Sequence, residues 1–71
     1  MQCVFTFPRR VRSTNVIIAG RLAEWHEPHE ERFTADDEGE AERIARGFLV
    51  INGVREGELL LSLHRSIYIR L

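Results

Sequence analysis

The chain has 71 residues, of which 44% are hydrophobic and 30% are charged, and its formal net charge is -1. These values are typical of a folded globular chain and exclude a disordered one, and the length predicts a single small domain over residues 1–71. One cysteine excludes an internal disulfide and a thiolate zinc cage. Neither a signal-peptide pattern nor an apolar run near the ~18 residues of a membrane span occurs, so we expect a cytoplasmic protein without membrane contact.

The first predicted element is a strand over Cys3–Phe7, because apolar side chains alternate with others and place Cys3, Phe5 and Phe7 on one face. Pro8 lacks a backbone N–H group and is expected to end this strand. Residues 9–15 are rich in Arg, Ser, Thr and Asn and predict a turn-like segment. Cys3 has no activating base nearby, so we expect a partly buried structural thiol.

A second, longer strand is predicted over Val16–Trp25, with Gly20 as a bulge. Pro28 is well suited to a corner, so a turn is expected around residues 27–30. Glu30–Phe33 then predicts a short third strand, and its charge places it at a sheet edge.

One helix is predicted between Thr34 and Gly53. Thr34 is followed three residues later by Asp37, which fits a capping pattern at the helix start. Asn52 and Gly53 tolerate a left-handed backbone and predict the helix end. A competing interpretation makes residues 48–51 a strand with Asn52-Gly53 as a hairpin turn. The helix would present one apolar stripe to a core, made of Ala41, Ile44, Ala45, Phe48 and Leu49.

The C-terminal segment predicts two more strands. Glu58–Leu63 places Leu59, Leu61 and Leu63 on one face, and residues 67–71 alternate in the same way after a tight hairpin. The predicted order is therefore β-β-β-α-β-β. We expect an α+β domain in which an antiparallel sheet of about five strands carries a single helix on one face.

Charge is unevenly distributed along the chain. Nine of the eleven acidic residues lie between positions 24 and 42, where Arg32 is the only arginine, so this segment carries a charge of -8. The remaining residues hold nine arginines and two glutamates, which gives +7. Such a segment creates a strong local field. Its acids are Glu24, Glu27, Glu30, Glu31, Asp36, Asp37, Glu38, Glu40 and Glu42.

Two interpretations of the acidic segment stay open. It is either a solvated turn and helix start, or a recognition face whose carboxylates imitate nucleic-acid phosphates and occupy a basic groove on another protein. In the second interpretation Trp25 is either an apolar anchor beside the charge or a core residue. The opposite hypothesis is a small nucleic-acid-binding or regulatory protein, whose phosphate-binding patch would be Arg9, Arg10, Arg12 and Arg21.

Catalytic and metal-binding chemistry are weakly indicated. His26 and His29 are three residues apart with Pro28 between them, which does not match the His-Glu-x-x-His zinc motif. No serine lies in a nucleophile elbow, and Gly53–Gly57 lacks the lysine and the spacing of a phosphate loop. We therefore expect a non-catalytic binding protein without a cofactor or metal.

The chain resembles small phage-encoded proteins, among which are anti-CRISPR inhibitors. The likeness rests on short length, arginine without lysine, a sheet with one helix, and a helix opening over Phe33–Ala45 in which an acidic start is followed by Ala41, Ile44 and Ala45. The resemblance implies a stoichiometric inhibitor that binds a CRISPR effector subunit in the host cell cytoplasm and blocks nucleic-acid recognition. It implies no catalytic residue.

A third hypothesis is a homo-oligomer. An exposed strand that carries Leu59, Leu61, Ile67 or Ile69 would then pair with another copy of the chain.

Overall fold

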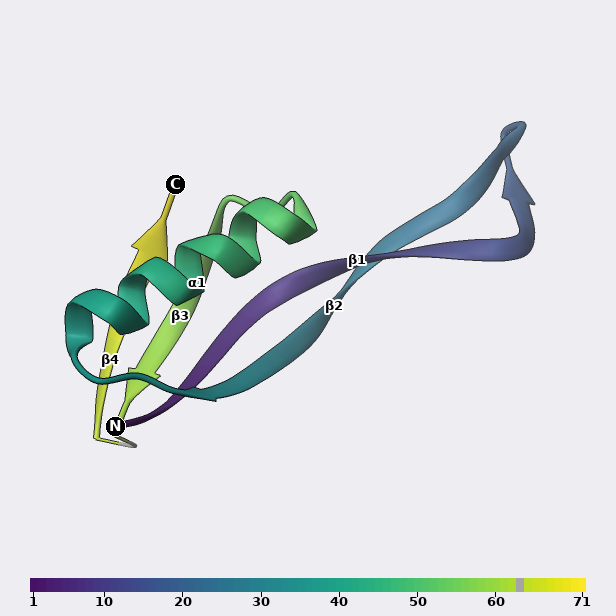
Figure 1. Ribbon diagram of the computed structural model, residues 1–71. Coiled ribbons are helices and arrows are strands. Elements are labelled where there is room, and N and C mark those ends of the chain that lie inside the picture. The colour runs from purple at the N-terminus through teal and green to yellow at the C-terminus, as the bar shows by residue number, and fades with distance from the viewer. Residues whose placement is uncertain (63) are drawn as a thin grey trace.

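A single antiparallel sheet of four strands, with the helix across one face, forms the fold (Figure 1). The computed structural model describes residues 1–62 and 64–71. The α+β class and the helix on one face of an antiparallel sheet are confirmed, whereas the prediction of five strands in the order β-β-β-α-β-β is wrong. The strand order across the sheet is β2-β1-β3-β4. The elements are β1 (Gln2–Ile18), β2 (Arg21–Thr34), α1 (Glu38–Asn52), β3 (Glu56–Leu61) and β4 (Arg65–Arg70).

The two prolines that were expected at a strand end and at a corner both lie inside long strands. Pro8 is in β1 and Pro28 is in β2, and the two residues are directly opposite each other in the antiparallel register. Neither has a backbone N–H group, so this position can only be a non-hydrogen-bonded pair, which needs no N–H between the strands. The two prolines therefore interrupt neither strand, and the three predicted N-terminal strands are two.

The hairpin turns at Ala19-Gly20, not near Pro28. Ala19 has a φ of 52° and Gly20 a φ of 78°, which fits a two-residue turn of the type that closes twisted hairpins. The predicted bulge at Gly20 is wrong, and the irregularity lies on the other strand. Arg12 pairs with Glu24 but Ile17 pairs with Leu22, so β1 contains three extra residues between these two pairs.

The helix begins later than predicted. Asp37 is the N-cap, and its side chain accepts a hydrogen bond of 2.8 Å from the backbone N–H of Glu40. Thr34 belongs to β2, so its predicted capping role is wrong. At the other end Gly53 has a φ of 64° and donates to the carbonyl of Val50, which confirms the predicted stop. The alternative strand over residues 48–51 is wrong.

The core lies between the helix and one face of the sheet. Cys3, Phe5 and Phe7 of β1 share the predicted face and are buried. Leu59 and Leu61 are buried beside them, while Leu63 lies outside the described residues. The helix contributes Ala41, Ala45 and Leu49, with Ile44 and Phe48 partly buried; β4 contributes Ile69 and the partly buried Ile67.

This core answers one hypothesis about self-association. Leu59, Leu61 and Ile69 are at most 4% exposed and face the helix side of the fold. These side chains are therefore not available as a contact surface, whereas pairing of the edge strand β4 with another copy stays a prediction.

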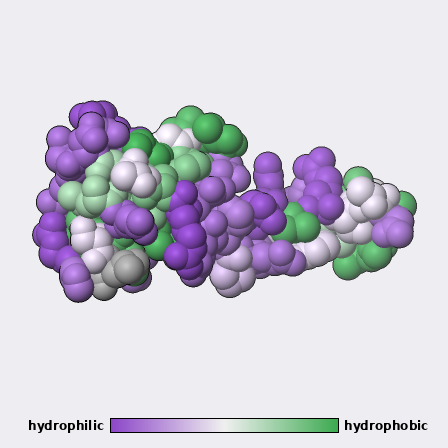
Figure 2. Space-filling model, turned by 60° about the horizontal axis from the view of Figure 1, so that its bottom comes forward, coloured by the Kyte–Doolittle hydropathy of each residue, from purple (hydrophilic) through white to green (hydrophobic). Residues whose placement is uncertain are grey.

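The sheet has a four-stranded region under the helix and a two-stranded region that extends beyond it. β1 pairs with β3 only over Cys3–Thr6, and from Phe7 onward it continues with β2 as a two-stranded ribbon. We call residues 9–27 the arm and the rest of the described chain the body. The arm extends from the body and gives the molecule dimensions of 46 × 19 × 16 Å (Figures 1 and 2).

Candidate functional site

The end of the arm exposes large apolar side chains. Val16, Ile17, Ile18 and Leu22 are 51%, 67%, 65% and 40% exposed. They surround the Ala19-Gly20 turn, and Figure 2 shows hydrophobic surface gathered at this end beyond a more hydrophilic stem. We call these four residues the tip. A two-stranded ribbon buries little apolar surface on its own, so the tip would gain stability from a covering partner.

The local sequence explains the shape of the tip. Ser13 Oγ accepts hydrogen bonds from the backbone N–H groups of Asn15, at 3.2 Å, and Val16, at 2.9 Å. These bonds close a small loop of β1 and absorb the three extra residues of that strand. After the loop, Ile17 and Ile18 rejoin β2 opposite Leu22 and Arg21.

Trp25 lies on the arm and is 43% exposed, so it is not a core residue. Its indole Nε1–H donates to Glu27 Oε1 at 2.9 Å, which holds the ring along β2. Val11 lies directly opposite Trp25 in the register and is partly buried. The indole therefore presents an apolar surface in the middle of the arm with its polar atom already satisfied.

The four arginines of the nucleic-acid hypothesis lie on the arm but are divided between its two faces. Arg9, Arg10 and Arg12 come from β1 and Arg21 from β2. Arg10 and Arg12 share one face, and Arg9, opposite Glu27, shares the other with Arg21. Arg12 is paired with Glu24 at 2.6 Å. Four arginines and two glutamates give the arm a charge of +2, and six arginines and nine acids give the rest of the chain -3.

The acidic residues divide into a strand group and a helix group. In β2, Glu24 and Glu30 lie on one face of the ribbon and Glu27 and Glu31 on the other, because successive side chains alternate. Glu24 binds Arg12, and Glu30 is 3.2 Å from Arg32. The strand acids thus face opposite directions, and two of them are partly neutralised.

The helix group lies at the opposite end of the fold from the tip. Asp37 caps the helix, and Glu38 forms an ion pair with Arg65 of β4. Asp36 is exposed in the connection before the cap. The negative side chains here complement the positive end of the helix dipole, which gives them a structural role. The members of this group are Asp36, Asp37, Glu38, Glu40 and Glu42.

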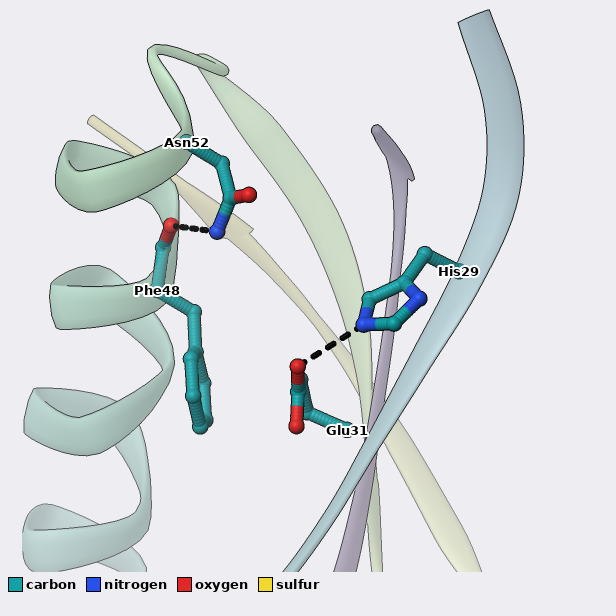
Figure 3. A network of polar contacts seen from close by, with 4 residues as sticks. All are labelled: His29, Glu31, Phe48 and Asn52. Carbon is teal, nitrogen blue, oxygen red and sulfur yellow. Dashed lines mark hydrogen bonds and ion pairs between the residues drawn. The ribbon is translucent and has the colours of Figure 1, made fainter. Parts of the chain in front are cut away.

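Where the arm joins the body, aromatic contacts connect β2 to β1 and to the helix, beside a polar pair within β2. Figure 3 shows His29 and Glu31 pointing from β2 toward the helix end that carries Phe48 and Asn52. The His29 ring is 2.7 Å from Glu31 Oε1 and makes an edge contact with Phe7, with ring centroids 5.3 Å apart. Phe48 stacks at a tilt on Phe33 of β2, with centroids 5.8 Å apart. These contacts fix the direction in which the arm leaves the body.

Strand alternation in β2 also separates His26 and His29, the two histidines considered as metal ligands. His26 and His29 differ in parity along β2, so they lie on opposite faces of the ribbon. Within residues 1–62 and 64–71, no group of three His, Cys, Asp or Glu side chains is arranged to hold a metal ion.

Cys3 is 1% exposed and its Sγ lies 3.8 Å from the carbonyl oxygen of Met1. Burial raises the pKa of its thiol above the ordinary value. This confirms the predicted buried strand cysteine, and an uncharged buried thiol is a poor nucleophile.

Comparison with protein-family models, curated proteins and solved structures finds no match to this chain. In the part of the chain that the structure describes, no helix is long and apolar enough to cross a membrane.

Sequence reasoning missed the tip. Val16, Ile17, Ile18 and Leu22 have the pattern of a strand in a covered sheet, and nothing in that pattern distinguishes a buried strand from an exposed one. The available signal was Ala19-Gly20 between two apolar pairs, a weak turn signal because Asn-Gly or Asp-Gly is the usual sequence.

Proposed function

We propose that this chain is a non-catalytic protein-binding module whose arm is its contact element. The observation that carries the proposal is the tip, where four large apolar side chains are 40–67% exposed at the end of a ribbon projecting from the body. Exposed apolar patches of this kind mark interaction sites, and an aromatic residue with a satisfied polar atom is a common anchor in them. Trp25 supplies that residue midway along the arm.

The separation of the chain into a packed body and an exposed arm supports the same function. The body holds the buried core and positions the arm through His29, Phe33 and Phe48. The arm contributes no side chain to that core. Changes in the arm should therefore alter binding while leaving the body folded.

A pull-down with a matched pair of variants tests this proposal. The tagged chain is incubated with bacterial lysate, with and without nuclease, and bound proteins are identified by mass spectrometry. Ile17→Ser with Ile18→Ser should remove the captured protein. The control, Val50→Ser with Ile51→Ser, changes two side chains of the helix end that are 66% and 83% exposed and should retain it. Equal capture by both double variants would refute a contact role for the tip.

The resemblance to anti-CRISPR proteins gives this binding function a narrower form. In that form the chain is an inhibitor, its partner is a CRISPR effector subunit with a basic nucleic-acid groove, and its acidic side chains compete with nucleic acid. The helix group of acids supports this, because Asp36 is exposed and Glu40 and Glu42 are partly exposed on one short segment. Replacing Asp36 and Glu40 by Arg should abolish binding to such a subunit, and unchanged affinity would exclude the inhibitor form.

A second candidate function is nucleic-acid binding by the arm. It is favoured by the presence of Arg9, Arg10, Arg12 and Arg21 on a ribbon with a charge of +2, since a two-stranded ribbon fits the major groove. Arg10→Glu should then weaken binding to duplex DNA, and the affinity should fall steeply with salt. If DNA does not bind at low salt, this candidate is excluded.

A further inference from the structure

One face of the arm has a charge pattern that is complementary to itself. Arg21, Ala23, Trp25 and Glu27 alternate along β2 and therefore share a face of the ribbon. The hydrogen bond between Trp25 and Glu27 confirms that these two side chains are neighbours. A cation and an anion thus flank a small and a large apolar residue, and Arg21 and Glu27 are equally far along the strand from Glu24.

We propose that this face binds the same face of a second copy of this chain, with the two arms antiparallel about a two-fold axis. The inference rests on the proposed function, because it names the partner of the arm. In a two-fold contact, if residue i meets residue j then j also meets i. When the midpoint between Ala23 and Trp25 lies on the axis, Trp25 packs on Ala23 of the partner subunit. Arg21 then meets Glu27 of the partner subunit, and this ion pair occurs twice.

The side chains of this face are available for such a contact. Trp25 is 43% exposed, and Arg21 and Glu27 are both exposed. Among the described residues the Arg21 guanidinium has no ion-pair partner. The Glu27 carboxylate accepts one hydrogen bond from the indole and retains acceptor capacity for a guanidinium. β1 adds Val11, opposite Trp25, and Ile18, opposite Arg21, to the apolar area. It also places Arg9 opposite Glu27, so that in the dimer each Glu27 carboxylate would lie between this arginine and Arg21 of the partner subunit.

The charge pattern favours a second copy over the other partners of the arm. A basic or an acidic partner is best matched by a face of one sign, whereas the β2 side chains of this face carry Arg21 and Glu27 at equal distances from an apolar centre. Seven residues of β2 at ~3.4 Å each give a contact only ~24 Å long and about two strands wide. The interface is small, so the dimer is expected to form at tens of micromolar protein.

Reciprocal charge reversal tests the proposal. The full chain and its variants Arg21→Glu and Glu27→Arg are studied by sedimentation velocity between about 10 and 500 µM in low salt. We expect a dimer of the unchanged chain and at least tenfold weaker association of each single variant, because each replaces two attractive contacts by two repulsive ones. An equimolar mixture of the two variants should regain the dimer, since its mixed pairs are again opposite in charge. Arg46→Glu on the helix is the control and should associate normally.

Each other outcome overturns the inference. A monomer at all concentrations excludes the dimer, and a dimer indifferent to both reversals uses another surface. Failure of the mixture to regain the dimer excludes the antiparallel pairing of Arg21 with Glu27. The pull-down separates these failures from failure of the proposed function. A monomeric chain that loses a captured protein when Ile17 and Ile18 become serine still has a binding arm, whose partner is a different protein or, if nuclease removes it, a nucleic acid.

Discussion

Gly57 of β3 has no room for a side chain against β1, and its replacement by alanine should destabilise the body. A Cβ atom at this position would lie 2.6 Å from Phe5 Cζ, 2.8 Å from Phe5 Cε1 and 2.7 Å from the carbonyl oxygen of Thr6. Phe5 is completely buried and packs on Phe7, with ring centroids 5.5 Å apart, so its ring has little room to move. The Thr6 oxygen belongs to the backbone of the β1–β3 pair. Both strands must therefore shift to admit one methyl group.

Overpacking of this kind costs about 1–3 kcal/mol. Alanine also restricts the unfolded chain, which offsets about 0.4–1 kcal/mol of that cost. We expect Gly57→Ala to lower the free energy of unfolding by about 1–2 kcal/mol. For a domain of this size the midpoint temperature should fall by about 4–16 °C. Thermal and urea unfolding followed by circular dichroism measure both quantities.

Gly47 provides the matched control. It lies in α1, and a Cβ atom added there meets nothing within 4 Å. Gly47→Ala should raise the free energy of unfolding by about 0.8–1 kcal/mol, because alanine has the higher helix propensity. If Gly57→Ala is as stable as the unchanged chain, β3 does not pack against Phe5 as closely as described.

Three further predictions concern single side chains. Asp37→Ala should lower stability by about 1 kcal/mol through loss of the helix cap, whereas Asp36→Ala should change urea unfolding little; equal effects would contradict the assigned cap. Burial raises the pKa of the Cys3 thiol in the folded chain above its value in the unfolded chain. The neutral thiol therefore contributes to stability at pH values below the unfolded-state pKa, and this contribution is lost as the pH rises through the folded-state pKa. Alkylation should thus be slow in the folded chain and fast in urea, and rapid labelling without urea would refute the burial. Ala19→Asn should stabilise the hairpin by up to about 1 kcal/mol, because Asn accepts a positive φ and Asn-Gly suits this turn, whereas Gly20→Ala should destabilise it; the reverse order in thermal unfolding would contradict the turn.

The parts of the fold that could be predicted from the sequence are the helix and strands that pack one face against the core. The apolar stripe of α1, the face shared by Phe5 and Phe7, and the stop at Gly53 all follow from spacing and backbone preference, and the structure confirms them. The helix start was misplaced because both Thr34 and Asp37 are good N-caps. Only the path of the chain out of β2 decides between them.

The arm could not be predicted because its decisive features depend on pairing. A proline alone indicates a strand end, but Pro8 and Pro28 form a non-hydrogen-bonded pair, where neither strand needs an N–H group from them. The tip could not be found either, because apolar side chains in a strand give the same pattern whether a layer covers them or not. The acids of β2 were predicted as one group, and strand alternation places them on two faces.

Because β1 and β2 pair in a regular register, the length of the arm can change without altering the body. From Gln2 opposite Thr34 to Arg12 opposite Glu24, each step along one strand is matched by one step along the other. Removing two residues from each strand beyond Pro8 and Pro28 would keep every remaining side chain on its face and shorten the arm by ~7 Å. Insertions of the same kind would lengthen it. Mutation can thus adjust how far the tip extends toward a partner while the core under the helix keeps every contact.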